Sequence, residues 1–221
     1  MKSTPIAVIT ADIVGSTRHS TKHRELIRRM VHYALREVNT TYRKELVVPI
    51  TVTVGDEFQG VVSPHWRVLS VADRLRGLMY CVEKRLAVEL YISMGIAHGI
   101  IRRGKESRMQ EGAAFYLSRR GMDMLKESTS RRTKLLTQSE NINELIDLIL
   151  GYQDMILSSW TTAQWQAIQM RDRGLSLKHI GRKLGVAYQN AQKRLKAANW
   201  EYYGRGRAYL ADLIRNTPLK G

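Results

Sequence analysis

The chain has 221 residues, of which 43% are hydrophobic and 25% are charged, as in an ordinary globular protein with a sizeable core. No uninterrupted apolar run reaches the roughly 18 to 20 residues that a membrane span needs. The single cysteine, Cys81, excludes an internal disulfide and a cysteine-rich metal site. We therefore expect a cytoplasmic protein with no membrane segment.

Basic residues outnumber acidic ones by 36 to 20, which gives a formal net charge of +16. The excess is concentrated at the C-terminal end, where residues 160–221 contain 12 basic and 3 acidic side chains and carry +9. Such a balance favours a polyanionic partner, although a well-solvated surface would have the same charge. The motifs have to decide between these interpretations.

An apolar strand is predicted over residues 5–14, where Ile and Val dominate, and the small residues 15–17 end it before a long helix. One face of this helix is expected to carry Leu26, Met30, Tyr33, Leu35 and Val38. Residues 46–54 and 58–62 predict a β-hairpin closed at Gly55 and Asp56. Glu57, next in the chain, is expected to be an exposed acid, and an outer-shell partner for a metal is the alternative.

The later elements complete an α+β unit. In chain order they are a helix from Pro64, a strand at 88–96, a basic loop at 100–110, a helix at 112–126, a strand at 134–137 and a helix at 142–157. This β-α-β-β-α-β-loop-α-β order predicts helices packed over an antiparallel sheet. Strand signals then stop, so we expect two domains, residues 1–157 and a small all-α unit of residues 158–221.

Two carboxylates are expected to face each other at one edge of the sheet. Asp12 ends the first strand, and Asp56 lies in the turn of the neighbouring hairpin. Adjacent carboxylates suit a divalent cation such as Mg²⁺ or Mn²⁺ bridged to phosphates. A phosphate would also be favoured by the backbone amides at the helix entrance, those of Gly15, Ser16 and Thr17. The simpler alternatives are an ordinary turn at Asp56 and a helix cap at Ser16 or Thr17.

Several segments resemble a known family. ADIVGST (11–17), TVGDEFQGVV (53–62) and MGIAHG (94–99) resemble, in order and spacing, the first strand, hairpin and next core strand of class III nucleotidyl cyclases. GAAFYLSRRG (112–121) is similar to the transition-state helix of that family. GDEFQG together with GAAFYLSR also resembles SatD-type proteins, which are small cyclase-like chains that end in a helix-turn-helix.

The resemblance implies specific roles. Asp12 and Asp56 would bind two divalent metals, Arg120 would stabilise the transition state, and a nucleoside triphosphate would be ligand or substrate. It also implies a homodimer that pairs head to tail with its sites at the seam. Two positions depart from the family: Val52 replaces the base-reading Lys or Glu, and Tyr116 replaces the ribose-positioning Asn. We therefore expect nucleotide binding to survive better than turnover.

Residues 176–198, SLKHIGRKLGVAYQNAQKRLKAA, match a helix-turn-helix. Ser176 is expected to cap the first helix, Gly181 to allow close helix approach and Gly185 to form the turn. The predicted buried face consists of Ile180, Leu184, Val186, Ala191 and Leu195. A preceding helix with Trp165 and a following helix over 200–214 would enclose the small core.

The outward face of the second helix predicts contact with double-stranded DNA. Its side chains are amides, cations and one phenol that can reach base edges and phosphates: Tyr188, Gln189, Asn190, Gln192, Lys193 and Lys196. Lys178 and Arg182 would add phosphate attraction. A helical bundle used for protein contacts is the simpler alternative. The sequence thus predicts a DNA-binding regulator with a nucleotide-binding domain; an active nucleotidyl cyclase and a catalytically dead dimerisation scaffold are the rivals.

Overall fold

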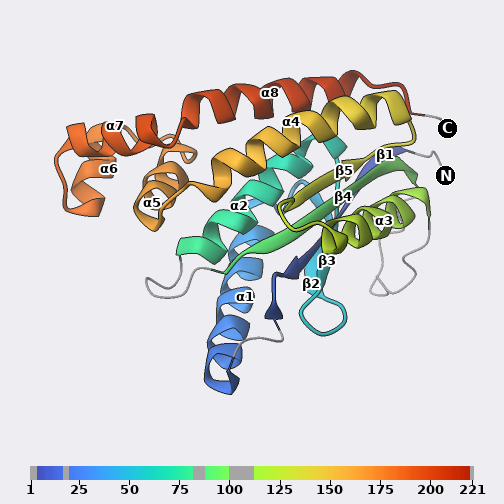
Figure 1. The fold of residues 1–221 in the computed structure, drawn as a ribbon, viewed down its shortest axis with the longest axis horizontal. Helices are drawn as coiled ribbons and strands as arrows, with labels where there is room; N and C mark the ends of the chain where they lie inside the picture. The colour runs from blue at the N-terminus through green and yellow to red at the C-terminus, as the bar shows by residue number, and fades with distance from the viewer. Residues whose placement is uncertain (1–3, 17–19, 82–87, 100–111, 220–221) are drawn as a thin grey trace.

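Five strands form one mixed sheet in the order β2-β3-β1-β4-β5 (Figure 1). The computed structural model describes residues 4–16, 20–81, 88–99 and 112–219. The strands are β1 (Thr4–Ile13), β2 (Leu46–Val52), β3 (Phe58–Val62), β4 (Leu90–Gly99) and β5 (Thr133–Leu136). The predicted hairpin is confirmed as β2 and β3. Thr17 and the predicted basic loop at 100–110 lie outside the described residues.

The expectation of a purely antiparallel sheet is wrong at its last strand. β4 pairs with β5 in parallel, with Ile92 opposite Thr133 and Gly95 opposite Leu136. The reason lies in the connection, because a helix between the two strands carries the chain back to the starting edge, and such crossovers join parallel strands. The other neighbouring pairs of the sheet are antiparallel.

Helices cover both faces of this sheet. The helical elements of the described chain, including those of the small C-terminal core, are α1 (Thr21–Thr41), the 3-10 turn η2 (His65–Arg67), α2 (Val68–Cys81), α3 (Ala113–Glu127), α4 (Glu140–Ser158), α5 (Thr162–Arg171), α6 (Leu177–Leu184), α7 (Tyr188–Ala197) and α8 (Trp200–Asn216). Side chains alternate along β1, so Ala7 and Ile9 pack in the core with α1 and α2, whereas Ile6 and Val8 pack against α3. Among the described residues, no helix is long and apolar enough to cross a membrane.

Helix α1 differs from its prediction at both its start and its face. It begins at Thr21, and the Ser20 hydroxyl accepts a hydrogen bond from the His23 amide, so Ser16 does not cap it. Tyr33 is 39% exposed and lies outside the buried face. The buried apolar side chains of this helix are Ile27, Met30, Val31, Ala34, Leu35 and Val38.

Helix α3 packs closely on β4 because two glycines leave room for it. A Cβ at Gly95 would overlap the carbonyl oxygen of Ala114, and one at Gly121 would overlap the Ser93 hydroxyl. Ser93 instead donates a hydrogen bond to the carbonyl of Ser118 at 2.7 Å. The glycine inside the MGIAHG segment therefore serves helix packing.

The C-terminal helices surround a small aromatic core. Trp160 and Trp165 meet edge to face with ring centres 4.7 Å apart, and Tyr203 of α8 contacts Trp160. The Ser176 hydroxyl caps α6 by accepting from the His179 amide. Gly185 ends α6 with a φ of 65°, a left-handed conformation that favours glycine. The predicted cap at Ser176 and the predicted turn at Gly185 are thus present.

Helix α8 reaches further than expected. Figure 1 shows it running back along α4, in the opposite direction, from the small core to the sheet. Its first turns contribute Tyr203 to the aromatic core, whereas Leu210 and Ile214 are buried in the main core with α1 and α2. The predicted boundary near residue 158 coincides with the end of α4. One helix nevertheless belongs to both cores.

Candidate functional site

A cavity of about 230 Å³ lies between α1 and the β2–β3 hairpin. It is lined by Ile13, Ser16, Arg24, Ile27, Arg28, Val31, His32, Val52, Gly55, Asp56 and Phe58. Three residues that the sequence predicted for a nucleotide site, Ser16, Val52 and Asp56, therefore meet here. Gly15, next to Ser16, turns the chain with a φ of 65°.

Basic side chains line the α1 side of this cavity. Arg24, Arg28 and His32 are spaced four residues apart, so the helical repeat places them on one exposed side of α1. The floor is apolar, with Phe58 1% and Ile13 4% exposed. Cations over an apolar floor suit a ligand with both a phosphate and a flat or apolar part. The sequence analysis missed these three residues, although their spacing could have indicated them.

Asp12 lies on the other face of β1, beneath α3. One oxygen of its carboxylate is 2.6 Å from the Lys126 ammonium, and the other accepts a hydrogen bond from the Ile13 amide at 2.8 Å. Among the described residues, those lining the cavity do not include Asp12. The structure therefore places Asp56, but not Asp12, in the lining of this cavity.

Glu57 is buried, so its prediction as an exposed hairpin acid is wrong. It is 7% exposed, and Arg119 donates to both of its carboxylate oxygens at 2.7 and 2.9 Å. Arg119 and Lys126 are seven residues apart and thus share one side of α3. This side of α3 supplies a cation to each of two acids, Asp12 and Glu57.

Tyr116 and Arg120 are exposed on α3, away from the cavity. Tyr116 is 68% exposed. The described part of the chain gives Arg120 no hydrogen bond or ion pair, and the helical repeat turns it away from Arg119. Since α3 covers the sheet face opposite α1, a single chain does not bring either residue to the cavity.

The described residues do not fit a two-metal centre as they are placed. They include no group of three or more His, Cys, Asp or Glu side chains that could hold a metal ion. Lys126 already neutralises Asp12, and Asp56 is the one carboxylate among the described cavity-lining residues. Any cation at Asp56 would therefore need ligands from outside this described set.

The eight residues predicted to contact DNA are all exposed. They are Lys178 and Arg182 on α6, and Tyr188, Gln189, Asn190, Gln192, Lys193 and Lys196 on α7. Beneath them Ile180 and Ala191 are fully buried, and Leu195 is 7% exposed. Residues 177–197 contain six Lys and Arg side chains and no Asp or Glu. The surface of α6 and α7 is therefore accessible and uniformly basic.

Comparison with known proteins identifies the family. Similar solved structures include the active GGEEF domain of a diguanylate cyclase from Vibrio cholerae (13% identity, TM-score 0.45, 61% of this chain and 85% of that chain). Another is a bacterial light-regulated adenylyl cyclase (13% identity, TM-score 0.41, 61% of this chain and 77% of that chain). A third is the guanylate cyclase domain of RhGC from Catenaria anguillulae in complex with GTP (18% identity, TM-score 0.41, 56% of this chain and 75% of that chain). None of the curated proteins matches. The SatD family matches residues 5–214, so the chain belongs to the SatD family.

Proposed function

We propose that this protein is a cytoplasmic DNA-binding regulator that reads duplex DNA with α7 and binds a nucleoside triphosphate beside α1. The observation that carries the DNA reading is the exposed, acid-free surface of α6 and α7. In a helix-turn-helix the second helix enters the major groove, where Gln189 and Asn190 could pair with base edges. Lys178 and Arg182 of α6 would face the phosphates and favour DNA of any sequence.

The nucleotide half of the proposal is supported by the cavity between α1 and the hairpin. Arg28 and His32 can face phosphate oxygens, and the apolar floor can accept a base. Val52 has no hydrogen-bonding group, so it would not discriminate strongly among bases. Binding of Mg²⁺ or Mn²⁺ by Asp12 and Asp56 stays a prediction, because Lys126 would first have to release Asp12.

An active nucleotidyl cyclase is the second candidate. Tyr116 and Arg120 are exposed on α3, where they could reach the cavity of a second copy. Even so, Tyr116 offers no amide to orient a ribose, and a misplaced hydroxyl can cost about 100-fold in rate. We therefore favour binding with slow or absent turnover, so that the nucleotide acts as a regulator of DNA binding.

We also propose that the chain forms a homodimer through α4 and α8. Between Glu144 and Ser158, the exposed positions of α4 are all large and apolar, and α8 adds two tyrosines beside them. The six side chains are Leu145, Leu148, Tyr152, Met155, Tyr202 and Tyr209. If two copies pair with their α4 helices antiparallel, Glu144 at one end of the patch would lie near the guanidinium of the partner's Arg205. A twofold dimer also suits paired DNA half-sites.

The DNA proposal is tested on the full chain by fluorescence anisotropy with duplex DNA. We expect Lys193→Gln with Lys196→Gln to weaken binding and to reduce the slope of log affinity against log salt by about 1.8, since two phosphate contacts are lost. The matched control, Arg43→Gln with Lys44→Gln, removes the same charge from an exposed turn after α1, outside α6 and α7. No binding by the parent at low salt, or equal losses in both variants, would overturn the proposal.

The nucleotide proposal is tested by calorimetric titration with each of the four ribonucleoside triphosphates. We expect Arg28→Gln to weaken binding about tenfold or more, because a charge-assisted hydrogen bond is lost. Arg29→Gln, also exposed on α1 and outside the cavity lining, is the matched control and should bind normally. Binding that is absent from the parent, or unchanged in Arg28→Gln, would contradict this half of the proposal.

A further inference from the structure

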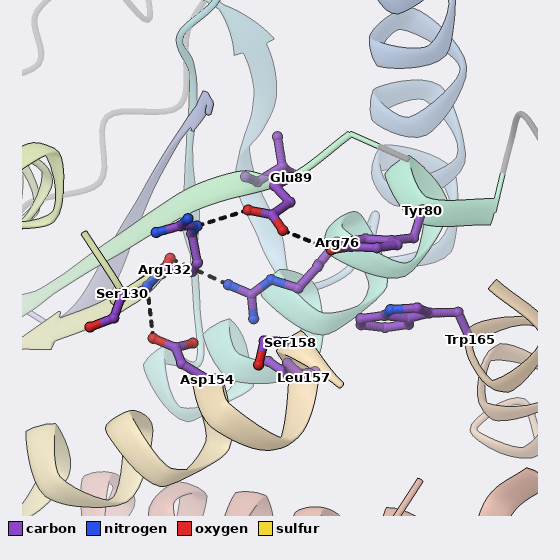
Figure 2. Close-up of a pocket in the computed structure, with 10 residues that line it drawn as sticks. Arg76, Tyr80, Glu89, Ser130, Arg132, Asp154, Leu157, Ser158 and Trp165 are labelled. Carbon is purple, nitrogen blue, oxygen red and sulfur yellow. Dashed lines mark hydrogen bonds and ion pairs between the residues drawn. The ribbon is translucent and has the colours of Figure 1, made fainter. Parts of the chain in front are cut away.

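A second cavity, of about 70 Å³, lies at the seam between the sheet and the C-terminal helices (Figure 2). Its lining comes from α2, β4, the β5 approach, the end of α4 and α5: Arg76, Tyr80, Glu89, Leu90, Ser130, Arg132, Asp154, Leu157, Ser158 and Trp165. Since about 10–15 Å³ of such space holds one water, it accommodates a group larger than a single water. None of these residues lines the cavity beside α1.

Arg76 is the central cation of this seam cavity and is incompletely paired. It is 3% exposed, and one terminal nitrogen donates to the Thr133 hydroxyl at 2.7 Å and to the Arg132 carbonyl at 3.4 Å. The other terminal nitrogen, Nη1, is buried and has no hydrogen-bond partner within the described residues. Figure 2 shows it directed away from Arg132, toward the Leu157–Ser158 end of α4.

Trp165 is a second buried donor without an acceptor in the same lining. Its ring is 2% exposed and stacks on Tyr80 with ring centres 5.2 Å apart. Within the described part of the chain, its indole Nε1 has no hydrogen-bond partner. A buried donor left unpaired destabilises the folded state, and more so when it is charged. Both unpaired donors belong to residues that line the seam cavity.

The acids that line the cavity are already used by other donors. Glu89 accepts from Arg132 at 2.9 Å and from the Tyr80 hydroxyl at 3.3 Å. Asp154 accepts from the Arg132 amide at 2.8 Å and from the Thr133 hydroxyl at 2.6 Å. Within the described residues, no carboxylate lies at ion-pair distance from Arg76. Arg76 is therefore linked to Asp154 only indirectly, through the Thr133 hydroxyl, and lacks a direct ion-pair partner among these residues.

We propose that the seam cavity binds a small oxyanion, a phosphate or a carboxylate, whose oxygens accept from Arg76 Nη1 and Trp165 Nε1. An oxyanion provides acceptors only, which matches the two unpaired donors, and its negative charge compensates Arg76. Arg76 belongs to α2 and Trp165 to α5, so the ligand joins the sheet domain to the helix that leads into α6 and α7. This site is separate from the proposed nucleotide cavity and places an effector beside the DNA-binding helices.

The test is thermal unfolding and calorimetry of the full chain with inorganic phosphate and, separately, with acetate, each against chloride at equal ionic strength. We expect saturable binding of one oxyanion and a higher melting temperature, because a ligand of the native state stabilises it. Phosphate binding alone identifies a phosphoryl ligand, and acetate binding identifies a carboxylate; either supports the proposal.

Variants separate this site from the cavity beside α1. Trp165→Phe keeps an aromatic ring beside Tyr80, although a smaller one, and removes the donor, so we expect it to fold and to bind the oxyanion severalfold more weakly. Arg76→Met should weaken binding about tenfold or more. Arg28→Gln is the control and should bind normally. The proposal is overturned if neither oxyanion stabilises the parent beyond chloride, or if binding survives Trp165→Phe but is lost in Arg28→Gln.

Discussion

Two basic side chains of α3 each form an ion pair with one acid, Asp12 near the end of β1 or Glu57 in the hairpin. Lys126 pairs with Asp12 at 2.6 Å and Arg119 with Glu57 at 2.7 Å. The Lys126 side chain is 45% exposed, so solvent screens its attraction to Asp12 and the pair contributes at most about 1 kcal/mol. The ammonium of Lys126 compensates the charge of Asp12 in this structure.

The Asp12–Lys126 pair predicts how removal of either charge changes stability. Asp12→Asn should lower the free energy of unfolding without metal by about 1 kcal/mol or less, since it removes an attraction. Lys126→Met should free Asp12 and increase the stabilisation by Mn²⁺, provided that Asp12 and Asp56 share a cation. Urea unfolding with and without Mn²⁺ measures both effects, with Lys44→Met as the control. No gain from Mn²⁺ in Lys126→Met would argue against the shared metal site.

At the scale of elements, polar contacts at two positions along α8 hold this helix to the sheet domain. Near its start, Arg207 donates to Asp73 of α2 at 2.7 Å, and Tyr203 donates to the same carboxylate at 2.6 Å. Near its end, the His65 ring nitrogen Nε2 lies 3.1 Å from the Ile214 carbonyl oxygen. Burial raises the pKa of Tyr203, so this phenol stays a donor at neutral pH. These contacts explain why α8 packs on both cores.

His65 makes the anchoring of α8 sensitive to acid. Burial, helped by the charge of His98, lowers the pKa of His65 below its usual value near 6.5, while the hydrogen bond to Ile214 opposes this. The folded state therefore binds the proton more weakly than the unfolded state. The contribution of neutral His65 to the free energy of unfolding is fully present above about pH 6.5. As the pH falls below this value the contribution decreases, by at most about 1.4 kcal/mol per pH unit.

Urea unfolding between pH 7.5 and 5.5 tests this sensitivity. His65→Gln keeps a donor for the Ile214 carbonyl and cannot be protonated, so its stability should change less with pH over this range than that of the parent. His23→Gln, at an exposed position of α1, should keep the pH dependence of the parent. Identical pH profiles for parent and His65→Gln would contradict the prediction.

At the scale of the whole molecule, the proposed homodimer depends on the apolar face of α4 and α8. Leu148 is 59% and Met155 67% exposed in the single chain, on a helix that shows no exposed charge between residues 144 and 158. We expect Leu148→Lys with Met155→Lys to convert a dimer to a folded monomer, because both changes face solvent in the monomer. Light scattering after size exclusion gives the mass, and circular dichroism checks folding.

Val54→Lys, at an 80% exposed hairpin position outside this face, is the control and should remain dimeric. A dimer should also bind twofold-symmetric DNA more tightly than the monomeric variant, because its two copies of α7 can contact both half-sites of one DNA molecule. A parent protein that is monomeric at micromolar concentration would contradict the dimer proposal.

Local sequence patterns determined the elements of this protein. Capping by Ser176 and the turn at Gly185 marked α6, and the apolar runs on either side of Gly55 and Asp56 marked the hairpin, because these signals act over a few neighbouring residues. Asp56, Val52 and Ser16 line one cavity, and the sequence had assigned each of them to the nucleotide site, whereas Asp12 and Tyr116, assigned to the same site, lie on the other face of the sheet.

Only the tertiary structure decided which distant side chains meet. It paired Glu57 with Arg119, turned Arg120 away and faced Arg28 into the cavity, and within the described residues it left Arg76 without a full set of partners. These outcomes depend on which side of α3, α1 or α2 faces the sheet, and on how far α8 runs back. A one-residue change around a helix rotates a side chain by about 100°. Neighbouring arginines such as 119 and 120 look alike in the sequence, but packing gives them different surroundings.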